Sequence, residues 1–493
     1  MDGHLEDLAC GAVRYASGLP GVAYCDARAE TRTGTQVLVE NGRIDHVRDV
    51  SDSGLGVRIL DGGRVWRFVS VSSPESADEV KGAIDGAGPR TRKGEEEEGP
   101  HAGMAAPTTA APHASIALRD VRPRTARITR RVAKNPDPDS IMSLGLECSK
   151  AISGMPHITN SVTAPRFEKV AKYFTSSEGA DILEEYTDTT ISMTATATAD
   201  NARSGGRITR TVDSTVGGRG GLEVIGGESH SRGLYVASRA AELAAAGTAK
   251  RAADADVVMN PNFVALLVHE ILGHPSEADR VMGREMAWAG GAWWGGMVGS
   301  KIASEPLSVF DDPTAAGSLG WYDYDDEGVK SSRTQLVKHG VLQGHMQSRE
   351  TAAAYGTEPT GNMRAAGYGF MPLIRMACTC IEPGDHAVDE MIRDIRDGYA
   401  IYDMKIPSID MNRYNWSISC QYARKITGGE LAETVRDVVV SGTAPGIFGS
   451  VSACGKDFEV TPITNCGKGD PMQSLAMGNG GPSIRGKAAV GSI

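Results

Sequence analysis

Threonines alternate with small residues between Asp188 and Ala199, which is the pattern of a strand with one exposed face. Strand-like runs also fill much of the first 85 residues, after a helical start rich in Ala and Gly. Asn41-Gly42 and Asp61-Gly62-Gly63 lie between such runs and are typical hairpin turns. The pattern predicts a small N-terminal α/β domain over residues 1–85, and more strands after it.

The composition changes sharply between the N-terminal domain and the next apolar segment. Residues 86–115 consist mainly of Gly, Pro, Ala and Thr, with an acidic block at Glu95–Glu98 and almost nothing to bury. Such a segment cannot offset the conformational entropy that folding costs. We expect a disordered loop there.

Helical spacing marks four later segments. Asp139–Ile152 has Ser140 as its expected cap, and Gly233–Ala253 is rich in Ala. A third helix begins near Asn262 and runs into His269, and Ala387–Asp397 is amphipathic. The resulting prediction is an α+β fold. It comprises the N-terminal domain, a central mixed region over 116–228, and a large β-rich C-terminal domain over 229–493 surrounding a metal-binding helix.

Charge and composition exclude several classes of protein. The net charge is −11, whereas a nucleic-acid-binding surface needs clustered Lys and Arg. The one basic run, 122–134, is interleaved with Thr, Ile and Val and predicts a strand. No segment approaches the roughly 20 apolar residues of a membrane span, and the N-terminus lacks the pattern of a signal peptide. Eight scattered cysteines without framework spacing favour a reduced, cytoplasmic protein.

The strongest chemical signal is His269-Glu270-x-x-x-His274. Zinc favours imidazole ligands, and an adjacent Glu can take a proton from water that attacks a peptide carbonyl. Five positions at roughly 100° each leave the two rings about 140° apart on a regular helix. A π-bulge or a break must therefore bring His274 round to His269. Gly273 permits such a distortion, and Pro275 disfavours a helical conformation of His274.

Two ordinary histidines at the end of an amphipathic helix would give the same sequence pattern without a metal site. The run before His269 is almost wholly apolar, so a buried His-Glu-His would be costly without a metal or other partners. Histidine is also scarce, with 11 in the chain. Both observations favour the metal site.

A catalytic zinc usually takes three protein ligands and leaves one position for water. Several residues compete for the third place on the sequence alone. The acidic candidates near the motif and the two thiols in turn-rich segments are Glu277, Asp279, Glu285, Cys454 and Cys466.

Several blocks in one order make the chain resemble the TldD/PmbA family over nearly its full length. They are His269–Asp279, Val309–Thr314, Tyr324–Gly328, Thr360–Arg364, Pro372–Met376, Glu382–Asp385 and an end pattern of Cys466-Gly-Lys, Gly478–Pro482, Arg485 and Val490-Gly491. The chain departs from the family at Pro275, where Gly is usual, in the spacing after Cys466, and in the acidic loop.

The resemblance implies a site and a mechanism. Cys466 rather than Cys454 is the implied third ligand, so that Zn²⁺ is held by His269, His274 and Cys466 with water in the fourth position. Glu270 is then the catalytic base that passes the water proton to the leaving amine. Because both histidines and the Glu are present, the chain resembles the metal-binding TldD type and not the TldE (PmbA) type.

The resemblance also implies the substrate and the assembly. Unfolded or short peptides, including leader or precursor peptides, are expected to bind as an extended strand along a sheet edge. The expected assembly is a homodimer or a heterodimer with a TldE/PmbA-like chain, with no nucleic acid and no membrane. Two rival functions stay open: a biosynthetic amidase acting on a small natural-product conjugate, and a non-catalytic peptide-binding scaffold with a structural metal.

A second acidic set could be interpreted as a site for a hard cation. It comprises Asp311, Asp312, Asp325, Asp326 and Glu327. Their turn-like settings, Asp-Asp-Pro-Thr and Asp-Asp-Glu-Gly, favour capping of backbone groups instead.

Overall fold

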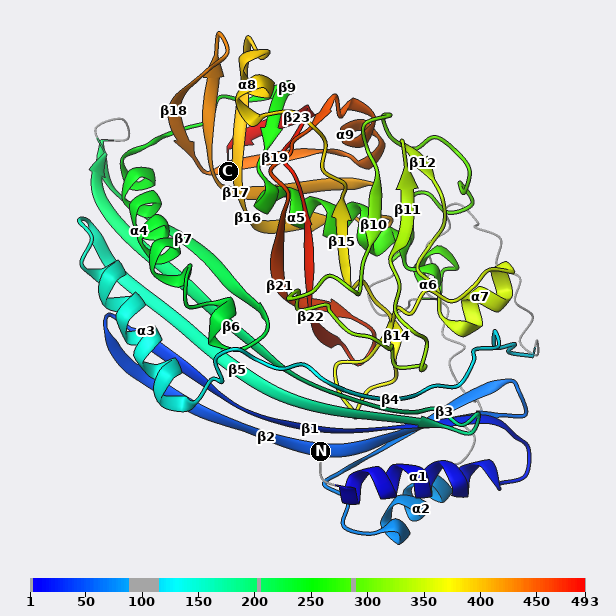
Figure 1. Ribbon diagram of the computed structural model, residues 1–493. Helices are drawn as coiled ribbons and strands as arrows, with labels where there is room; N and C mark the ends of the chain where they lie inside the picture. Colours follow the sequence, from blue (N-terminus) through cyan, green and yellow to red (C-terminus); the bar gives the residue numbers. More distant parts are fainter. Residues whose placement is uncertain (1–2, 88–114, 202–204, 285–289, 493) are drawn as a thin grey trace, which may run out of the picture.

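The computed structural model describes residues 3–87, 115–201, 205–284 and 290–492. The disordered loop expected over 86–115 lies almost entirely outside the described residues. The fold is mixed α/β with strands predominating, which confirms the predicted class (Figure 1).

The N-terminal half builds one long, curved sheet of seven strands. Its order is β3-β2-β1-β5-β6-β4, and β7 pairs with β6. The strands are β1 (Val22–Glu40), β2 (Arg43–Asp61), β3 (Val65–Ser72), β4 (Thr125–Thr129), β5 (Ile158–Ser176), β6 (Asp181–Asn201) and β7 (Gly206–Arg219). The expected N-terminal domain and central region thus share a sheet, because β1 pairs with β5 along most of its length. The boundaries at 85, 115 and 228 stay predictions.

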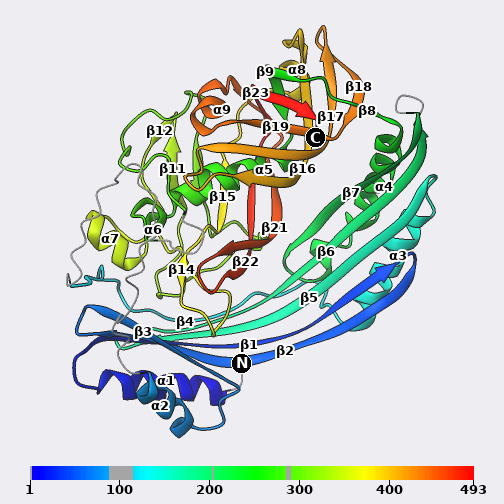
Figure 2. The ribbon, with the colours of Figure 1, turned by 180° about the vertical axis from the view of Figure 1, so that it is seen from behind.

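Two pairs of helices pack on this sheet with separate apolar cores. Near the N-terminus lie α1 (Gly3–Ser17) and α2 (Ala77–Gly86), and at the other end of the strands lie α3 (Pro138–Ser153) and α4 (Ser229–Ala245) (Figures 1 and 2). Asp137 caps α3, and Ser140 completes a capping box, so the expectation of Ser140 as the cap was wrong. The helix expected to reach Ala253 ends at Ala245, because the chain turns into strands that join a C-terminal sheet.

The C-terminal half contains two larger sheets and a two-stranded ribbon, β13-β14. One sheet has the order β16-β9-β23-β19-β17-β18-β8, with β20 on β23, and the other has the order β12-β11-β10-β15-β22-β21. Their strands are β8 (Gly247–Thr248), β9 (Ala252–Met259), β10 (Val309–Asp311), β11 (Thr334–Lys338), β12 (Val341–Leu342), β13 (Met363–Arg364), β14 (Leu373–Ile374), β15 (Cys378–Ile381), β16 (Asp397–Ile409), β17 (Asn415–Thr427), β18 (Glu430–Arg436), β19 (Val438–Thr443), β20 (Ala453–Cys454), β21 (Glu459–Lys468), β22 (Gln473–Gly481) and β23 (Ile484–Ser492).

Helix α5 (Pro261–Val268) lies between these two C-terminal sheets and contacts β16 on one side and β22 on the other. Asn260 caps it by accepting the N–H of Phe263 at 3.0 Å, and Pro261 occupies its first turn. Its residues are buried on every side except at Asn262, which is expected of a helix that is apolar all round. A rigid buried helix therefore carries the chain into the His269 motif.

Short helices complete the C-terminal half. They are α6 (Ala278–Val281), α7 (Arg349–Tyr355), α8 (Val388–Arg393) and α9 (Ala444–Ser450), with single turns at η1 (Leu222–Val224), η2 (His269–Gly273) and η3 (His274–Ser276). The helix expected over 387–397 is therefore shorter, because β16 begins at Asp397. Within the described residues no helix is long and apolar enough to cross a membrane.

Candidate metal centre and active site

The chain changes its helical pitch at the His269 motif. Helix α5 continues into a π-helical turn, His269–Gly273, in which the N–H of His274 donates to the carbonyl of His269. The extra residue brings the two imidazoles together, with ring centroids 4.7 Å apart. The predicted irregularity is therefore present as a π-turn, whereas His274 keeps helical dihedral angles (φ −57°, ψ −43°) although Pro275 follows it. At Gly273 a Cβ would lie 2.0 Å from the sulfur of Met376, so a larger residue there would have to displace the Met376 side chain.

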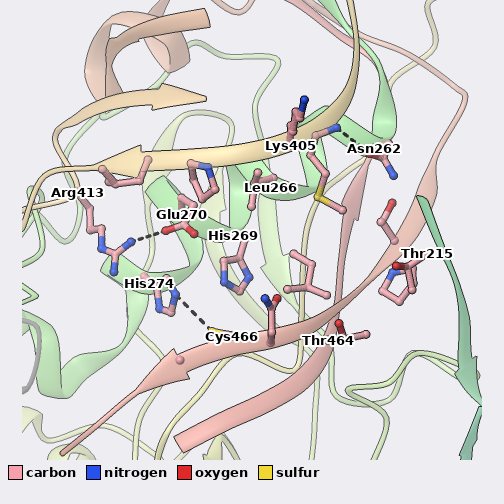
Figure 3. A pocket seen from close by; sticks show the side chains of 18 of the residues that line it. Thr215, Asn262, Leu266, His269, Glu270, His274, Lys405, Arg413, Thr464 and Cys466 are labelled. Carbon is pink, nitrogen blue, oxygen red and sulfur yellow. Dashed lines mark hydrogen bonds and ion pairs between the residues drawn. The ribbon is translucent and has the colours of Figure 1, made fainter. Parts of the chain in front are cut away.

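Cys466 approaches the two histidines from β21, nearly two hundred residues later in the chain. Its Sγ lies 3.5 Å from Nε2 of His274, and one donor atom from each of the three residues lies within 4.8 Å of the others. All three side chains are buried (Figure 3). Cys454 lies on β20 with its Sγ against the carbonyl of Pro306, at 3.7 Å, and does not belong to this cluster.

The far ring nitrogens of both histidines have polar partners. Nδ1 of His269 lies 3.1 Å from Oδ1 of Asn479 on β22, and Nδ1 of His274 lies 3.3 Å from Oε2 of Glu277. An amide oxygen and a carboxylate can only accept, so each Nδ1 carries a hydrogen, and in the neutral ring Nε2 is the nitrogen left to bind a metal. This is the tautomer that a metal ligand needs.

Glu277 is the centre of a buried charged group behind His274. Its Oε2 accepts from Nε of Arg280 at 2.7 Å and from Nζ of Lys468 at 3.1 Å. Lys468 is fully buried and also contacts Asp279 at 2.7 Å. Burial raises the pKa of Glu277, but Lys468, His274 and Arg280 outweigh it and hold that pKa well below its usual value. Glu277 and Asp279, which competed for the third ligand, are thus engaged behind the cluster, while Glu285 lies outside the described residues.

The cluster itself favours a thiolate. Burial opposes the charge on Cys466, but His269, His274 and Arg375 together lower the pKa of its thiol well below the usual value. Burial likewise opposes the charge on His269, and the neighbouring Cys466 raises the pKa of that imidazole to about 9. A thiolate next to two imidazoles is a donor set of the kind that binds zinc.

Glu270 points to the open side of the cluster. Its carboxylate accepts a hydrogen bond from Nη1 of Arg413, on the turn between β16 and β17 (Figure 3). It lines a pocket of about 670 Å³ together with all three residues of the cluster. The walls come from β7 at 213–215, from β16 and its turn, and from β21 at 461–467. A carboxylate thus lies between the cluster and a space large enough for several residues of a peptide.

The acidic set is used differently. Asp311 accepts four hydrogen bonds, from the N–H groups of Ala377 and Cys378 and from the side chains of Thr379 and Asn362. Asp325 accepts three backbone N–H groups, and Asp312, Asp326 and Glu327 each accept at least one. The expected capping role is therefore confirmed for this set. Among the described residues, the only group with the arrangement of a metal site is His269, His274 and Cys466.

Three models of a single family match nearly the whole chain. The PmbA/TldA metallopeptidase domain 1 matches residues 25–88, the central domain matches 132–252 and the C-terminal domain matches 252–490. A metalloprotease of Methanothermobacter thermautotrophicus is 31% identical over 471 residues, which is 95% of each chain. The chain belongs to the PmbA/TldD metallopeptidase family. It is accordingly a peptidase, as the resemblance of its motifs implied.

More distant relatives agree with the family. A zinc metalloprotease TldD homolog of Saccharolobus solfataricus is 29% identical over 244 residues, 49% of this chain and 52% of the relative. The crystal structure of TldE from Thermococcus kodakarensis superimposes with a TM-score of 0.72 at 17% identity, covering 99% of both chains. The structural likeness shows that the fold is shared along the whole chain.

Motif analysis missed three groups that complete this site. Asn479 lies within Gly478–Pro482, and Lys468 follows Cys466 in the end pattern, so both were in view without a role. Arg413 lies in an ordinary turn, and nothing in its sequence neighbours indicates contact with Glu270. Only the pairing of β16 with β17 brings the turn there.

Proposed function

We propose that this protein is a zinc peptidase in which His269, His274 and Cys466 hold the ion and Glu270 is the general base. The observation that carries the proposal is the convergence of two imidazoles and a thiol within 4.8 Å, beside a carboxylate that faces an open pocket. The chemistry of this donor set fits zinc, which is four-coordinate and keeps one position open when three protein side chains bind it. Bound there, zinc would supply a Lewis acid that polarises a peptide carbonyl and makes a water molecule more acidic.

Side chains of the protein transfer the proton, orient the ligands and exclude water. Glu270 takes a proton from the attacking water and delivers it to the nitrogen of the leaving amine, so that the carboxylate is regenerated. Asn479 and Glu277 fix the two imidazoles in one tautomer and one orientation. The apolar surroundings of α5 keep bulk water away from the inner side of the cluster.

Two strand edges line the pocket and support an extended peptide as the substrate. Within the described residues, β21 is the last strand of its sheet and β7 pairs only with β6. Unpaired main-chain groups of an edge strand can bind a peptide backbone whatever its side chains are. Short or unfolded peptides, including leader or precursor peptides, are therefore the proposed substrates. A pocket of about 670 Å³ leaves room for more than a small conjugate, which favours a peptidase over an amidase of small molecules.

The similarity to TldE supports a second part of the proposal. That structure covers nearly the full length of this chain, so two such folds can associate through equivalent surfaces. We propose a homodimer or a heterodimer with a TldE/PmbA-like chain, in the cytoplasm. Light scattering of the protein alone and with such a chain tests it, and a monomer in both samples would contradict it.

Replacing Glu270 with Gln is the direct test of the mechanism. The amide cannot accept the water proton, and kcat on an unstructured, quenched fluorescent peptide should fall about 100-fold or more. The variant should still bind about one zinc per chain, measured by atomic emission, because Gln leaves the three ligands in place. Full activity in this variant would refute the role of Glu270. Activity in metal-free protein would refute the metallopeptidase mechanism.

A further inference from the structure

Arg413 forms an ion pair with Glu270, the proposed general base. Its Nη1 donates to Oε2 of Glu270, and the two side chains are only 15% and 13% exposed. Within the described part of the chain, Glu270 is the only hydrogen-bond partner of this guanidinium. A guanidinium carries five N–H donors, so donors beyond the one bonded to Glu270 stay available in the pocket that both residues line.

The turn that carries Arg413 is built to hold it in place. Arg413 has φ of 59°, in the left-handed region that costs energy for a residue with a side chain. The side chain of Asp410 fixes the turn by accepting the N–H groups of Tyr414 and Asn415, each at 2.9 Å. The carbonyl of Met411 accepts the N–H of Gly291 at 2.8 Å and anchors the outer side. A strained residue in a braced turn beside a reactive carboxylate suggests a catalytic role for its side chain.

The charge balance of the reaction indicates what that role is. When water attacks the peptide carbonyl, its oxygen forms a bond to carbon, and the π-electron pair moves to the carbonyl oxygen. The water proton goes to Glu270 in the same step. One negative charge therefore leaves the Glu270 carboxylate and appears on the carbonyl oxygen, while the total charge stays constant.

We propose that Arg413 is a catalytic residue that transfers its hydrogen bond from Glu270 to the oxyanion of the substrate. Protonation of Glu270 removes the ion pair that holds the guanidinium, at the moment when a new anion forms in the same pocket. A preorganised cation aimed at developing charge stabilises the transition state more than the ground state. When the C–N bond breaks, the electron pair returns to the carbonyl, the proton passes from Glu270 to the amine, and Arg413 pairs with Glu270 again.

The proposal rests on the zinc peptidase function above and makes a separate prediction. Arg413→Met should lower kcat about 100-fold or more on the quenched peptide, with KM changed less than threefold, because the bond to the oxyanion forms only in the transition state. It should also weaken binding of a phosphinic tri-alanine analogue by a similar factor, because the phosphinate resembles the tetrahedral intermediate. Zinc content should stay at the wild-type level.

Two further variants keep the test decisive. Arg413→Lys retains the charge without the planar fork and should recover part of the lost kcat. Arg333→Met removes a more exposed Arg–Glu pair away from the pocket, that of Arg333 with Glu382 at 2.7 Å, and should leave kcat and analogue binding unchanged. Wild-type or higher kcat in Arg413→Met would mean that Arg413 only restrains Glu270, and loss of zinc in that variant would make its role structural. Either result overturns the proposal. Different results would contradict the zinc peptidase function itself: wild-type protein that binds no zinc, or a Glu270→Gln variant that is active.

Discussion

Two buried polar regions lie in the C-terminal half, and they use their side chains in opposite ways. At the cluster of His269, His274 and Cys466, one donor atom of each side chain lies within 4.8 Å of the other two. At the acidic turns of Asp311, Asp325 and Glu327, each carboxylate is surrounded by N–H and O–H groups of the chain itself. Both regions are almost fully buried.

The difference shows how a site for a ligand is distinguished from a structural polar core. Density of charge does not decide it, because the full acidic set, with Asp312 and Asp326, has five ionisable groups and the cluster has three. The second ring nitrogen decides it: Nδ1 of each cluster histidine is bonded to Asn479 or Glu277, and Nε2 is left for a metal, which would displace any proton it carries. The oxygens of Asp311, by contrast, already accept four hydrogen bonds and have little left for a cation.

Removing a ligand on the cluster side should have the largest effect. Cys466→Ala should reduce zinc from about one ion per chain to near zero after dialysis against a chelator, and activity should disappear with it, because only two ligands are left. Atomic emission of the dialysed protein measures the effect.

Cys454→Ala is the matched control. The thiol of Cys454 is buried in the apolar core, burial raises its pKa to about 11, and its Sγ lies 3.7 Å from the carbonyl of Pro306. This variant should keep its zinc. Zinc that stayed in Cys466→Ala, or was lost from Cys454→Ala, would contradict the choice of Cys466 as the third ligand.

The opposite outcome is expected on the acidic side. Asp311→Ala should lower the free energy of unfolding by about 3 kcal/mol, because it leaves several buried donors without an acceptor. Zinc content should not change. Urea unfolding with and without about 5 mM Ca²⁺ or Mg²⁺, several times the roughly 1 mM Kd of the weakest extracellular calcium sites, completes the test. Stabilisation of the wild-type protein by either cation would show that these acids form a cation site after all.

The sequence allowed the cluster to be predicted better than its surroundings. The five-residue spacing of His269 and His274 demands a distortion, and helix geometry alone therefore predicted a π-bulge or a break in the helix. No local pattern could link Cys466 to these histidines, and only the family resemblance favoured it over Cys454. Contacts such as Arg413 with Glu270 depend on strand pairing across long separations, which a single sequence does not specify.

The fold was predictable to a similar extent. Turn residues and alternation indicated the strands, and the mixed class is confirmed. The shared N-terminal sheet was not foreseen, because the pairing of β1 with β5 joins segments that the acidic loop separates. The end of α4 was overestimated, because a run rich in Ala favours a helix until tertiary pairing overrides it.

An intermediate effect is expected where a structural charge supports the cluster. Lys468→Met removes a fully buried cation from Glu277, which in turn orients His274. Zinc affinity should fall about 10- to 100-fold, as is typical for a residue that orients a ligand. Competition with a chromophoric chelator measures it. Lys468→Arg should recover part of the zinc affinity. Unchanged zinc affinity in Lys468→Met would show that the contact of Lys468 with Glu277 does not support the metal site.

The smallest expected effect is the pH dependence that Asp325 of the acidic turns contributes. Burial, and then the charge of Glu327, raises the pKa of Asp325 to about 8, whereas an unfolded aspartate has a pKa of about 4. The folded chain therefore binds more protons than the unfolded chain between these values, and this carboxyl makes stability fall as pH rises through that window. The slope is at most about 1.4 kcal/mol per pH unit for one proton.

Asp325→Asn should be less stable at pH 6, because the amide cannot accept all three backbone N–H groups, but it should lose less stability between pH 6 and pH 8. Asp385→Asn, at a side chain that is 99% exposed, should keep the wild-type slope in the same urea titrations. If the free energy of unfolding changed equally with pH in Asp325→Asn and wild type, the proton would bind to a group other than Asp325. The contrast in charge between the acidic turns and the metal cluster would then disappear.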